Sequence, residues 1–171
     1  MRKGITIGKD VYIAPTASII GKVEVGDRCV ILDSAVIRGD QNRIVIGPES
    51  NVQDNATIHA DLGNEAVIGK GVSIGHNAIV HGAFIGDHVL VGMGSIVMNG
   101  SRIGSGSVVG AGAVVTEDFT CNENSLVLGL PAKVIRMEDT NRQRAILNAI
   151  SYQELRKNLT KGVYERYVHH Q

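Results

Sequence analysis

The segment GHNAIVHG, residues 75–82, carries two histidines, His76 and His81, five residues apart. Imidazole nitrogens are common ligands of zinc and other transition metals, so the pair raises the question of a metal site. A spacing of five residues turns two side chains about 140° apart on an α-helix and places them on opposite faces of a β-strand. His76 and His81 therefore cannot bind one ion from the same regular element.

The elements that position these histidines follow from an internal repeat. Isoleucine or valine recurs at every sixth residue, except for steps of nine, ten and five residues after Ile37, Ile58 and Val80, and glycine, which permits sharp turns, often follows it. The registered positions are Ile7, Ile13, Ile19, Val25, Ile31, Ile37, Ile46, Val52, Ile58, Ile68, Ile74, Val80, Ile85, Val91, Val97, Ile103, Val109 and Val115. Each hexad is predicted to form one short strand and one corner, so that three hexads close a triangular coil.

This repeat predicts the fold class. About six triangular coils, stacked at the roughly 4.8 Å spacing of paired parallel strands, give a mainly β protein, a parallel β-helix over residues 1–137. Residues 138–171 are predicted to form a C-terminal α-helix and tail that pack on the same domain, with Gly162 as a C-cap. The helix residues at three- and four-residue spacing are Ala145, Ile146, Ala149, Ile150 and Gln153. His169 and His170 are interpreted as surface residues of the tail.

Composition excludes several classes of partner. The 171-residue chain has a formal net charge of zero, and its scattered basic residues give no electrostatic footprint for nucleic acid or an anionic membrane. Cys29, at a position expected in the interior, and Cys121 are too few for a disulfide framework. No segment resembles a signal peptide or a membrane span of about 20 apolar residues. We therefore expect a cytoplasmic protein without nucleic-acid or membrane partners.

The repeat converts sequence spacing into position. Ile58 and Val80 lie on the same edge, one coil apart, so His59 and His81 are predicted to stack with backbones about 4.8 Å apart. Both imidazoles can then reach one ion at the roughly 2.1 Å of a metal–nitrogen bond. His76 belongs to a different edge and cannot reach that ion within its own chain. A homotrimer would place His76 of one chain beside the stacked pair of its neighbour.

A simpler interpretation applies to each histidine alone, because a histidine at a solvated corner usually has no function. Three histidines in ligand-compatible positions of one register are harder to dismiss in this way. His88 fits no such position and is interpreted as a structural residue.

Charged and amide side chains share these edges. Arg38 is predicted to stack beneath His59, with Asp40 two residues later, and Gln53 and Asp54 lie one coil below Gly75 and His76. In the expected trimer they would cluster around the metal, where such groups orient ligands and tune bound water. The alternative is a salt bridge that stabilises the trimer without a chemical role, and both interpretations stay open.

The segments VIRGDQNRIVIG, NVQDNATIHA, SIGHNAIVHG and VGMGSIVMNG resemble the γ-class carbonic anhydrases of the hexapeptide-repeat family. The resemblance covers essentially the whole chain and implies a left-handed β-helix, a homotrimer, and Zn²⁺, Fe²⁺ or Co²⁺ between subunits. It also implies site residues: the metal ligands His59, His76 and His81, the interface residues Arg38, Asp40 and Asp54, Gln53 beside the metal-bound water, and Tyr152 near the site. The implied activity is the reversible hydration of CO2 to bicarbonate by a metal-bound hydroxide.

The chain departs from the best-known γ-class pattern where protons would leave the site. Gln41 replaces a glutamate of some members, and the loop after His59 is only ADLGNEA, with Asp61 and Glu65 as its acids. These acids do not match the family's proton shuttle, which predicts slow or buffer-dependent turnover.

Two other functions compete with this one. The segments GAGAVV and GLPAKVIR also occur in hexapeptide-repeat acyltransferases, which bind an acyl-coenzyme A between subunits and use a histidine as general base. Such an enzyme has no need of three histidines in one register. The second alternative is a non-catalytic, metal-stabilised trimer that acts as a scaffold.

Overall fold

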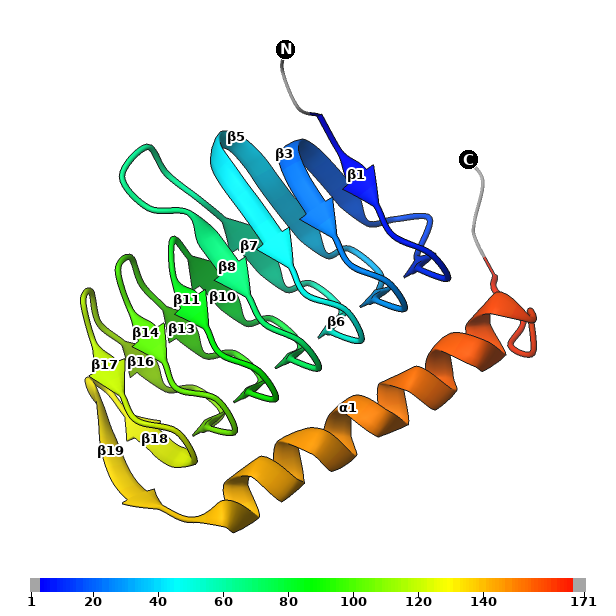
Figure 1. Cartoon of the computed structure of the whole chain (residues 1–171). Coiled ribbons are helices and arrows are strands. Elements are labelled where there is room, and N and C mark those ends of the chain that lie inside the picture. The colour runs from blue at the N-terminus through cyan, green and yellow to red at the C-terminus, as the bar shows by residue number, and fades with distance from the viewer. Residues whose placement is uncertain (1–3, 168–171) are drawn as a thin grey trace.

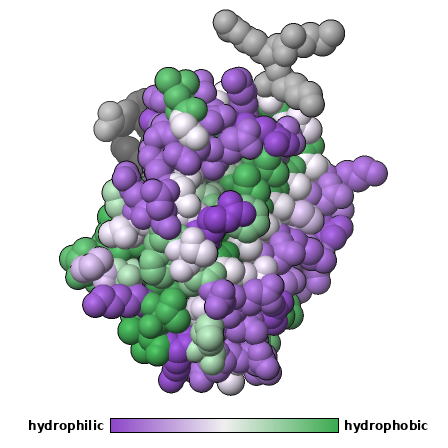
Figure 2. Space-filling model, turned by 60° about the vertical axis from the view of Figure 1, so that its left-hand side comes forward, coloured by the Kyte–Doolittle hydropathy of each residue, from purple (hydrophilic) through white to green (hydrophobic). Residues whose placement is uncertain are grey.

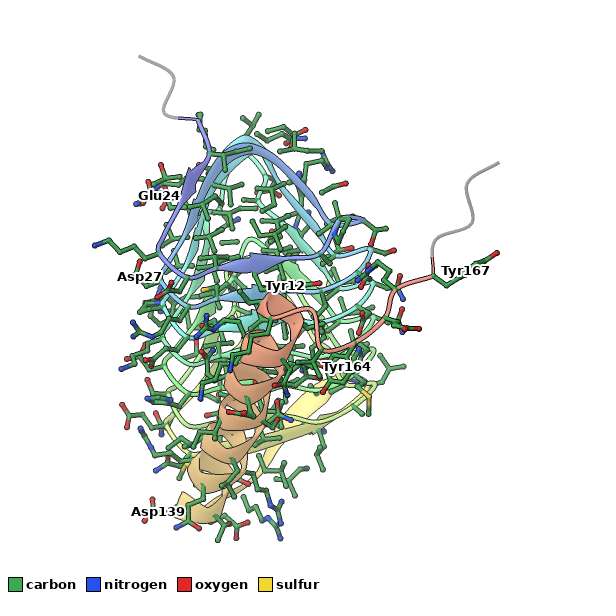
Figure 3. The ribbon with its side chains drawn as sticks, turned by 90° about the vertical axis from the view of Figure 1, so that its right-hand side faces the viewer. Tyr12, Glu24, Asp27, Asp139, Tyr164 and Tyr167 are labelled. Atoms are coloured by element: carbon green, nitrogen blue, oxygen red, sulfur yellow. The ribbon has the colours of Figure 1, made fainter. Side chains whose placement is uncertain are left out.

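The computed structural model describes residues 4–167, so His169 and His170 lie outside the described residues. The chain winds into a triangular prism whose three sides are columns of short parallel strands (Figure 1). Viewed from its end, the prism shows a triangular outline filled with side chains (Figure 3). The predicted left-handed parallel β-helix with a C-terminal helix is confirmed.

Successive coils supply one strand to each side of the prism. Side 1 contains β1 (Thr6–Ile7), the end of β3 (Ser18–Val25), the end of β5 (Val36–Ile46), β8 (Ala66–Ile68), β11 (Phe84–Ile85), β14 (Arg102–Ile103) and β17 (Thr120–Cys121). Side 2 contains β2 (Tyr12–Ile13), β4 (Val30–Ile31), β6 (Asn51–Val52), β9 (Ser73–Ile74), β12 (Leu90–Val91), β15 (Val108–Val109) and β18 (Ser125–Gly129). Side 3 contains the starts of β3 and β5, β7 (Thr57–His59), β10 (Ile79–His81), β13 (Ile96–Val97) and β16 (Val114–Val115).

The core consists of ladders of β-branched side chains along the prism axis. On side 3, Ile37 pairs with Ile58 and Ile58 with Val80, and all three are fully buried. Branched side chains suit this packing because they lose little rotamer freedom on a pleated surface. These ladders fix the register of the residues that follow each strand.

The chain makes about seven turns, one more than the repeat predicted. The ladders continue beyond Val115, because Cys121 pairs with Ile103 and Val127 pairs with Val109. The sequence pattern missed this turn because Cys121 replaces a β-branched residue there. Cys121 and Cys29 are both buried and free, and burial raises the pKa of the Cys29 thiol to about 11.

The last turn leads into β19 (Ala132–Met137), which pairs antiparallel with β18, and then into α1 (Asp139–Thr160). α1 runs along the prism beside side 2 (Figure 1). It ends at Thr160, and the C-cap is Lys161, one residue before the predicted Gly162. Gly162 follows the cap with a φ of 66°, and the Gly162 and Val163 N–H groups donate to the Leu159 and Asn158 carbonyls.

The contact face of α1 is narrower than its sequence pattern predicted. Ala145 and Ala149 are buried against the coils, whereas Ile150 is 58% exposed. Polar contacts add to the attachment, since Gln153 Nε2 donates to the backbone oxygens of Arg28 and Glu49. Among the described residues, no helix has both the length and the apolar composition to cross a membrane.

Candidate metal centre

His59 and His81 stack at the corner between sides 3 and 1. They are paired residues of β7 and β10, and their ring centroids lie 4.8 Å apart. His59 Nδ1 faces His81 Nε2 at 2.8 Å. Two nitrogens of a tetrahedral zinc site, each about 2.1 Å from the ion, lie about 3.4 Å apart. The pair therefore fits a shared ion once the two nitrogens lie about 0.6 Å farther apart.

The outer nitrogen of His59 has an acidic partner. Its Nε2 lies 3.2 Å from Asp40 Oδ1, and Arg38 Nη1 donates to the other carboxylate oxygen at 2.6 Å. Although desolvation alone would raise it, hydrogen bonds from Arg38 and His59 hold the pKa of Asp40 below its ordinary value. An ionised Asp40 accepts the His59 Nε2–H, so the lone pair of His59 lies on Nδ1, facing His81.

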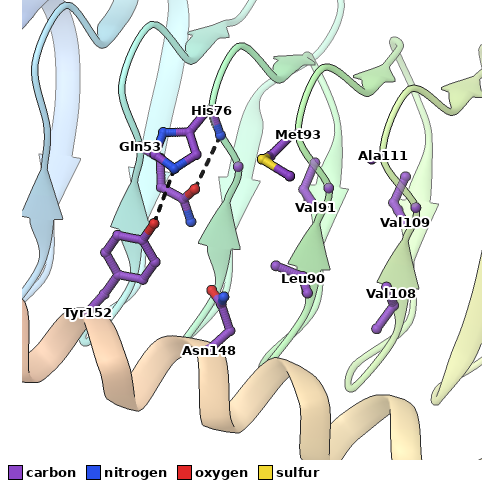
Figure 4. A pocket seen from close by; sticks show the side chains of 13 residues that line it. Gln53, His76, Leu90, Val91, Met93, Val108, Val109, Ala111, Asn148 and Tyr152 are labelled. Carbon is purple, nitrogen blue, oxygen red and sulfur yellow. Dashed lines mark hydrogen bonds between the residues drawn. The ribbon is translucent and has the colours of Figure 1, made fainter.

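His76 lies at a different corner, between sides 2 and 3, and its side chain is 37% exposed. Its Nδ1 is 2.9 Å from Asp54 Oδ2, which places the N–H on Nδ1 and leaves the lone pair on Nε2. The Tyr152 hydroxyl, from α1, lies 3.4 Å from that Nε2 (Figure 4). Burial, with a smaller contribution from Asp54, raises the pKa of Tyr152, so its hydroxyl stays a neutral donor.

Gln53 is held rigidly beside His76. It is 3% exposed, its Oε1 accepts the His76 backbone N–H at 3.2 Å, and its Nε2 donates to Asn51 Oδ1 at 3.0 Å. Asn51 is itself fixed, because its amide donates to the Ser73 hydroxyl at 2.8 Å. This chain of buried hydrogen bonds sets the orientation of the Gln53 amide and leaves its second N–H free for another partner.

A pocket of about 400 Å³ opens beside Gln53, His76 and Tyr152 (Figure 4). The pocket lies between α1 and side 2, and the rest of its wall is mostly apolar. The other lining residues are Gly75, Leu90, Val91, Gly92, Met93, Val108, Val109, Gly110, Ala111 and Asn148. A small uncharged molecule could reach the exposed edge of His76 from this pocket.

The predicted residues thus form two groups at two corners of one chain. Arg38 pairs with His59 in register, and Asp40 and His81 complete the first group. The second group consists of Gln53, Asp54, His76 and Tyr152. Within residues 4–167, no three His, Cys, Asp or Glu side chains are placed to hold a metal ion together. His88, interpreted as structural, adopts φ 53° at a turn and belongs to neither group.

Sequence reasoning missed the partners that fix these groups. Asn51 was not identified, although it lies two residues before Gln53 on the same strand face. Asn99 contacts His81, and Asn99 Nδ2 donates to Asp61 Oδ2 at 2.8 Å. The register could have revealed Asn99. Val80 pairs with Val97, His81 directly follows Val80, and Asn99 comes two residues after Val97, so Asn99 lies one coil above His81.

Asp61 is an acceptor for several donors at once. Its Oδ1 accepts the Gly63 and Asn64 backbone N–H groups at 3.2 Å. Although desolvation alone would raise it, hydrogen bonds from Asn99, Gly63 and Asn64 hold the pKa of Asp61 below its ordinary value. Asp61 therefore carries a negative charge at neutral pH.

Comparison with known proteins matches both the coil and the site region. Residues 40–144 match the family model described as the GMPPB C-terminal domain, and residues 4–39 match the model described as bacterial transferase hexapeptide (six repeats). A Bacillus cereus protein for which acetyltransferase activity has been suggested has a solved structure with a TM-score of 0.89 at 34% identity, covering 93% of both chains.

Several relatives carry the name carbonic anhydrase. The "Probable carbonic anhydrase" of Methanocaldococcus jannaschii is 47% identical over 90% of this chain and 97% of that protein. "Gamma carbonic anhydrase 2, mitochondrial" of Arabidopsis thaliana is 35% identical over 78% of this chain and half of that protein. The chain therefore belongs to the hexapeptide-repeat proteins and, within them, to the γ-class carbonic anhydrase-like family.

Proposed function

We propose that this chain forms a homotrimer that hydrates CO2 reversibly to bicarbonate at three zinc sites. Each site would take His59 and His81 from one chain and His76 from a neighbouring copy, with Fe²⁺ and Co²⁺ as alternative ions for the same imidazoles. The family relationship supports the reaction, and the arrangement of the histidines supports the shared site.

One observation carries this proposal: the nitrogens of His59 and His81 that face each other are only 2.8 Å apart. The opposite nitrogen of each ring has an oxygen partner, Asp40 for His59 and Asn99 for His81. With the ring protons on those outer nitrogens, two lone pairs meet between the rings. Two lone pairs at that distance repel unless a proton or a metal cation lies between them, and a zinc ion bound by both nitrogens would remove that repulsion.

His76 supplies the complementary half of the site. Its Nε2 lone pair is directed away from Asp54, and its partial exposure leaves it accessible to another chain. Side 3 also exposes apolar side chains, with Ile20 at 45% and Ile79 at 37%. The space-filling view shows apolar areas between hydrophilic side chains on the face that it presents (Figure 2). A threefold contact over side 3 would bury these groups and bring the two kinds of corner together.

Zinc held by three imidazoles lowers the pKa of water to about 7 and so supplies a hydroxide nucleophile at neutral pH. The chain's own residues orient the reactants. Gln53 offers its free amide N–H next to His76, from a position fixed by two hydrogen bonds. Asp40 and Asp54 hold the rings of His59 and His76. The apolar pocket beside Gln53 suits CO2, which carries no charge and little polarity.

Proton removal is the weak step of this design. Asp61 already accepts three hydrogen bonds, and its lowered pKa makes it a poor base, because an efficient one has a pKa near the working pH. The other acid of this loop, Glu65, is paired with a cation, because its Oε2 lies 3.9 Å from Arg43 Nη1. We therefore expect the hydration rate to rise severalfold with imidazole buffer concentration at constant pH and ionic strength. A rate that does not depend on buffer would contradict this expectation.

The proposal is tested by metal analysis and stopped-flow CO2 hydration of protein purified with and without air. A mixing experiment tests the shared site. His76→Ala and His81→Ala chains each lack one kind of ligand. In trimers assembled at random from an equal mixture, about a quarter of the interfaces join an intact His76 to an intact pair of His59 and His81. Recovery of about a quarter of the metal and activity supports the shared geometry. Stable heterotrimers without any recovery would refute it.

Acyl transfer is the second candidate, because the Bacillus cereus relative was suggested to be an acetyltransferase and the pocket beside His76 is mostly apolar. This function predicts binding of acetyl-coenzyme A without metal. Isothermal titration of metal-free protein with acetyl-coenzyme A separates the two functions, since a carbonic anhydrase has no requirement for that ligand.

A further inference from the structure

His81 is the first member of a hydrogen-bonded relay that leads away from the candidate metal centre. Its Nδ1 lies 2.7 Å from Asn99 Oδ1, and Asn99 Nδ2 donates to Asp61 Oδ2 at 2.8 Å. Asn99 comes from the coil above His81, and Asp61 comes from the loop that follows His59. The relay thus joins three coils at the same corner.

The contacts of Asp61 decide every hydrogen bond in this relay. Its Oδ1 accepts two backbone N–H groups and its Oδ2 accepts from Asn99 Nδ2, so the Asn99 atom that faces the carboxylate is the NH2 group. The Asn99 oxygen then faces His81, and it can only accept. His81 must therefore carry its proton on Nδ1, which leaves the Nε2 lone pair directed at His59.

The surrounding backbone fixes the direction of the hydrogen bonds in this relay. Asp61 Oδ1 accepts the Gly63 and Asn64 backbone N–H groups, so its other oxygen is the one that meets Asn99. Gly82, directly after His81, adopts φ 54°, and a Cβ atom at that position would collide with the Asn99 side chain. The missing side chain at residue 82 gives Asn99 its path to the imidazole.

We propose that Asp61 and Asn99 are positioning residues that lock His81 in the tautomer able to bind metal. This inference rests on the proposed metal site and adds to it two residues that do not touch the ion. Groups that orient a ligating histidine typically contribute 10- to 100-fold to metal affinity.

The substitution Asp61→Asn tests the proposal without removing the loop contacts. The single oxygen of the new amide is drawn to the Gly63 and Asn64 N–H groups, so its NH2 group faces the NH2 group of Asn99. Asn99 must then rotate and present its NH2 group to His81 Nδ1, which favours the opposite tautomer. Nitrogen NMR of the metal-free protein is expected to show the His81 proton moving from Nδ1 to Nε2.

The same variant is expected to bind Co²⁺ roughly 10- to 100-fold more weakly, as measured by chelator competition and the visible spectrum of the bound ion. The double variant Asp61→Asn with Asn99→Asp exchanges the amide and the carboxylate. It restores an acceptor for the His81 Nδ1–H and a donor for that acceptor, so affinity and tautomer are expected to recover.

A matched control exists at the corner between sides 1 and 2, away from His59, His76 and His81. Asn124 Nδ2 donates to Asp139 Oδ1 at 2.8 Å, the same amide–carboxylate contact. Asp139→Asn is expected to change neither Co²⁺ affinity nor the His81 tautomer. An unchanged tautomer in Asp61→Asn, or an exchanged pair that fails to recover while the trimer and its melting temperature are preserved, would overturn the inference. If His81 is protonated on Nδ1 as expected but the protein does not hydrate CO2, the proposed function is refuted and the inference about the relay stands.

Discussion

The three corners of the prism differ in how closely they keep the six-residue repeat. Every step from side 1 to side 2, and from side 2 to side 3, is six residues long. The corner between sides 3 and 1 has steps of nine, ten and five residues in three consecutive coils. These steps run from Ile37 to Ile46, from Ile58 to Ile68 and from Val80 to Ile85.

The irregular corner is the one that builds a preorganised half-site. Asp40 and Asp61 lie in the two long steps, and the short step places Gly82 beside Asn99. His59, at this corner, is only 7% exposed. The regular corner between sides 2 and 3 instead presents His76 at the surface, where it can meet another molecule. Departures from a repeat supply the extra polar groups that an internal ligand pair needs, whereas the repeat itself suffices to display one residue.

The largest expected effect separates histidines at the two kinds of corner. His81→Ala removes a ligand from the irregular corner and is expected to lower bound metal and CO2 hydration by more than the roughly 100-fold that a lost orienting partner costs. His88→Asn, at a regular corner, is the control, because asparagine tolerates the positive φ of that position. Metal content and stopped-flow rates measure both. Similar losses in the two variants would remove the distinction between the corners.

Core substitutions sharpen the comparison through stability. Ile58 and Ile103 are both fully buried, and replacing either by alanine is expected to destabilise the fold by about 3 kcal/mol. Only Ile58→Ala removes packing next to His59, so only this variant is expected to bind Co²⁺ more weakly. Denaturant unfolding at one protein concentration measures stability, and chelator competition measures affinity. Equal affinities would show that the ladder does not position the histidines.

Gln53 tests whether the regular corner also takes part in the chemistry. Gln53→Ala leaves all three histidines in place, so metal content is expected to stay unchanged. Loss of its preorganised hydrogen bond is expected to lower the hydration rate by roughly 100-fold. Asn148→Ala is the control, since Asn148 lines the same pocket from α1. A Gln53→Ala rate equal to the parent's would remove Gln53 from the mechanism.

The sequence predicted backbone register better than side-chain contacts. Arg38, His59 and His81 pair in the predicted order, because buried ladders such as Ile37, Ile58 and Val80 leave no freedom of register. The hydrogen bond from Asn99 to Asp61 spans a loop whose path no periodicity describes. The exposure of Ile150 was missed for a related reason. Spacing defines the face of a helix, but the small side chains of Ala145 and Ala149 decide how narrow the contact is.

The smallest expected effect concerns the contact between α1 and the regular corner. Tyr152 donates to His76 Nε2 over 3.4 Å, and Nε2 is the nitrogen that the proposed site needs. Tyr152→Phe frees that lone pair, and since a long neutral hydrogen bond contributes little, Co²⁺ affinity is expected to rise only about two- to threefold. Tyr164→Phe is the control, because its hydroxyl lies 3.5 Å from Asn158, away from the histidines. A fall in affinity for Tyr152→Phe would mean that the hydroxyl supports His76 rather than competing with the ion, and the regular corner would then be preorganised as well.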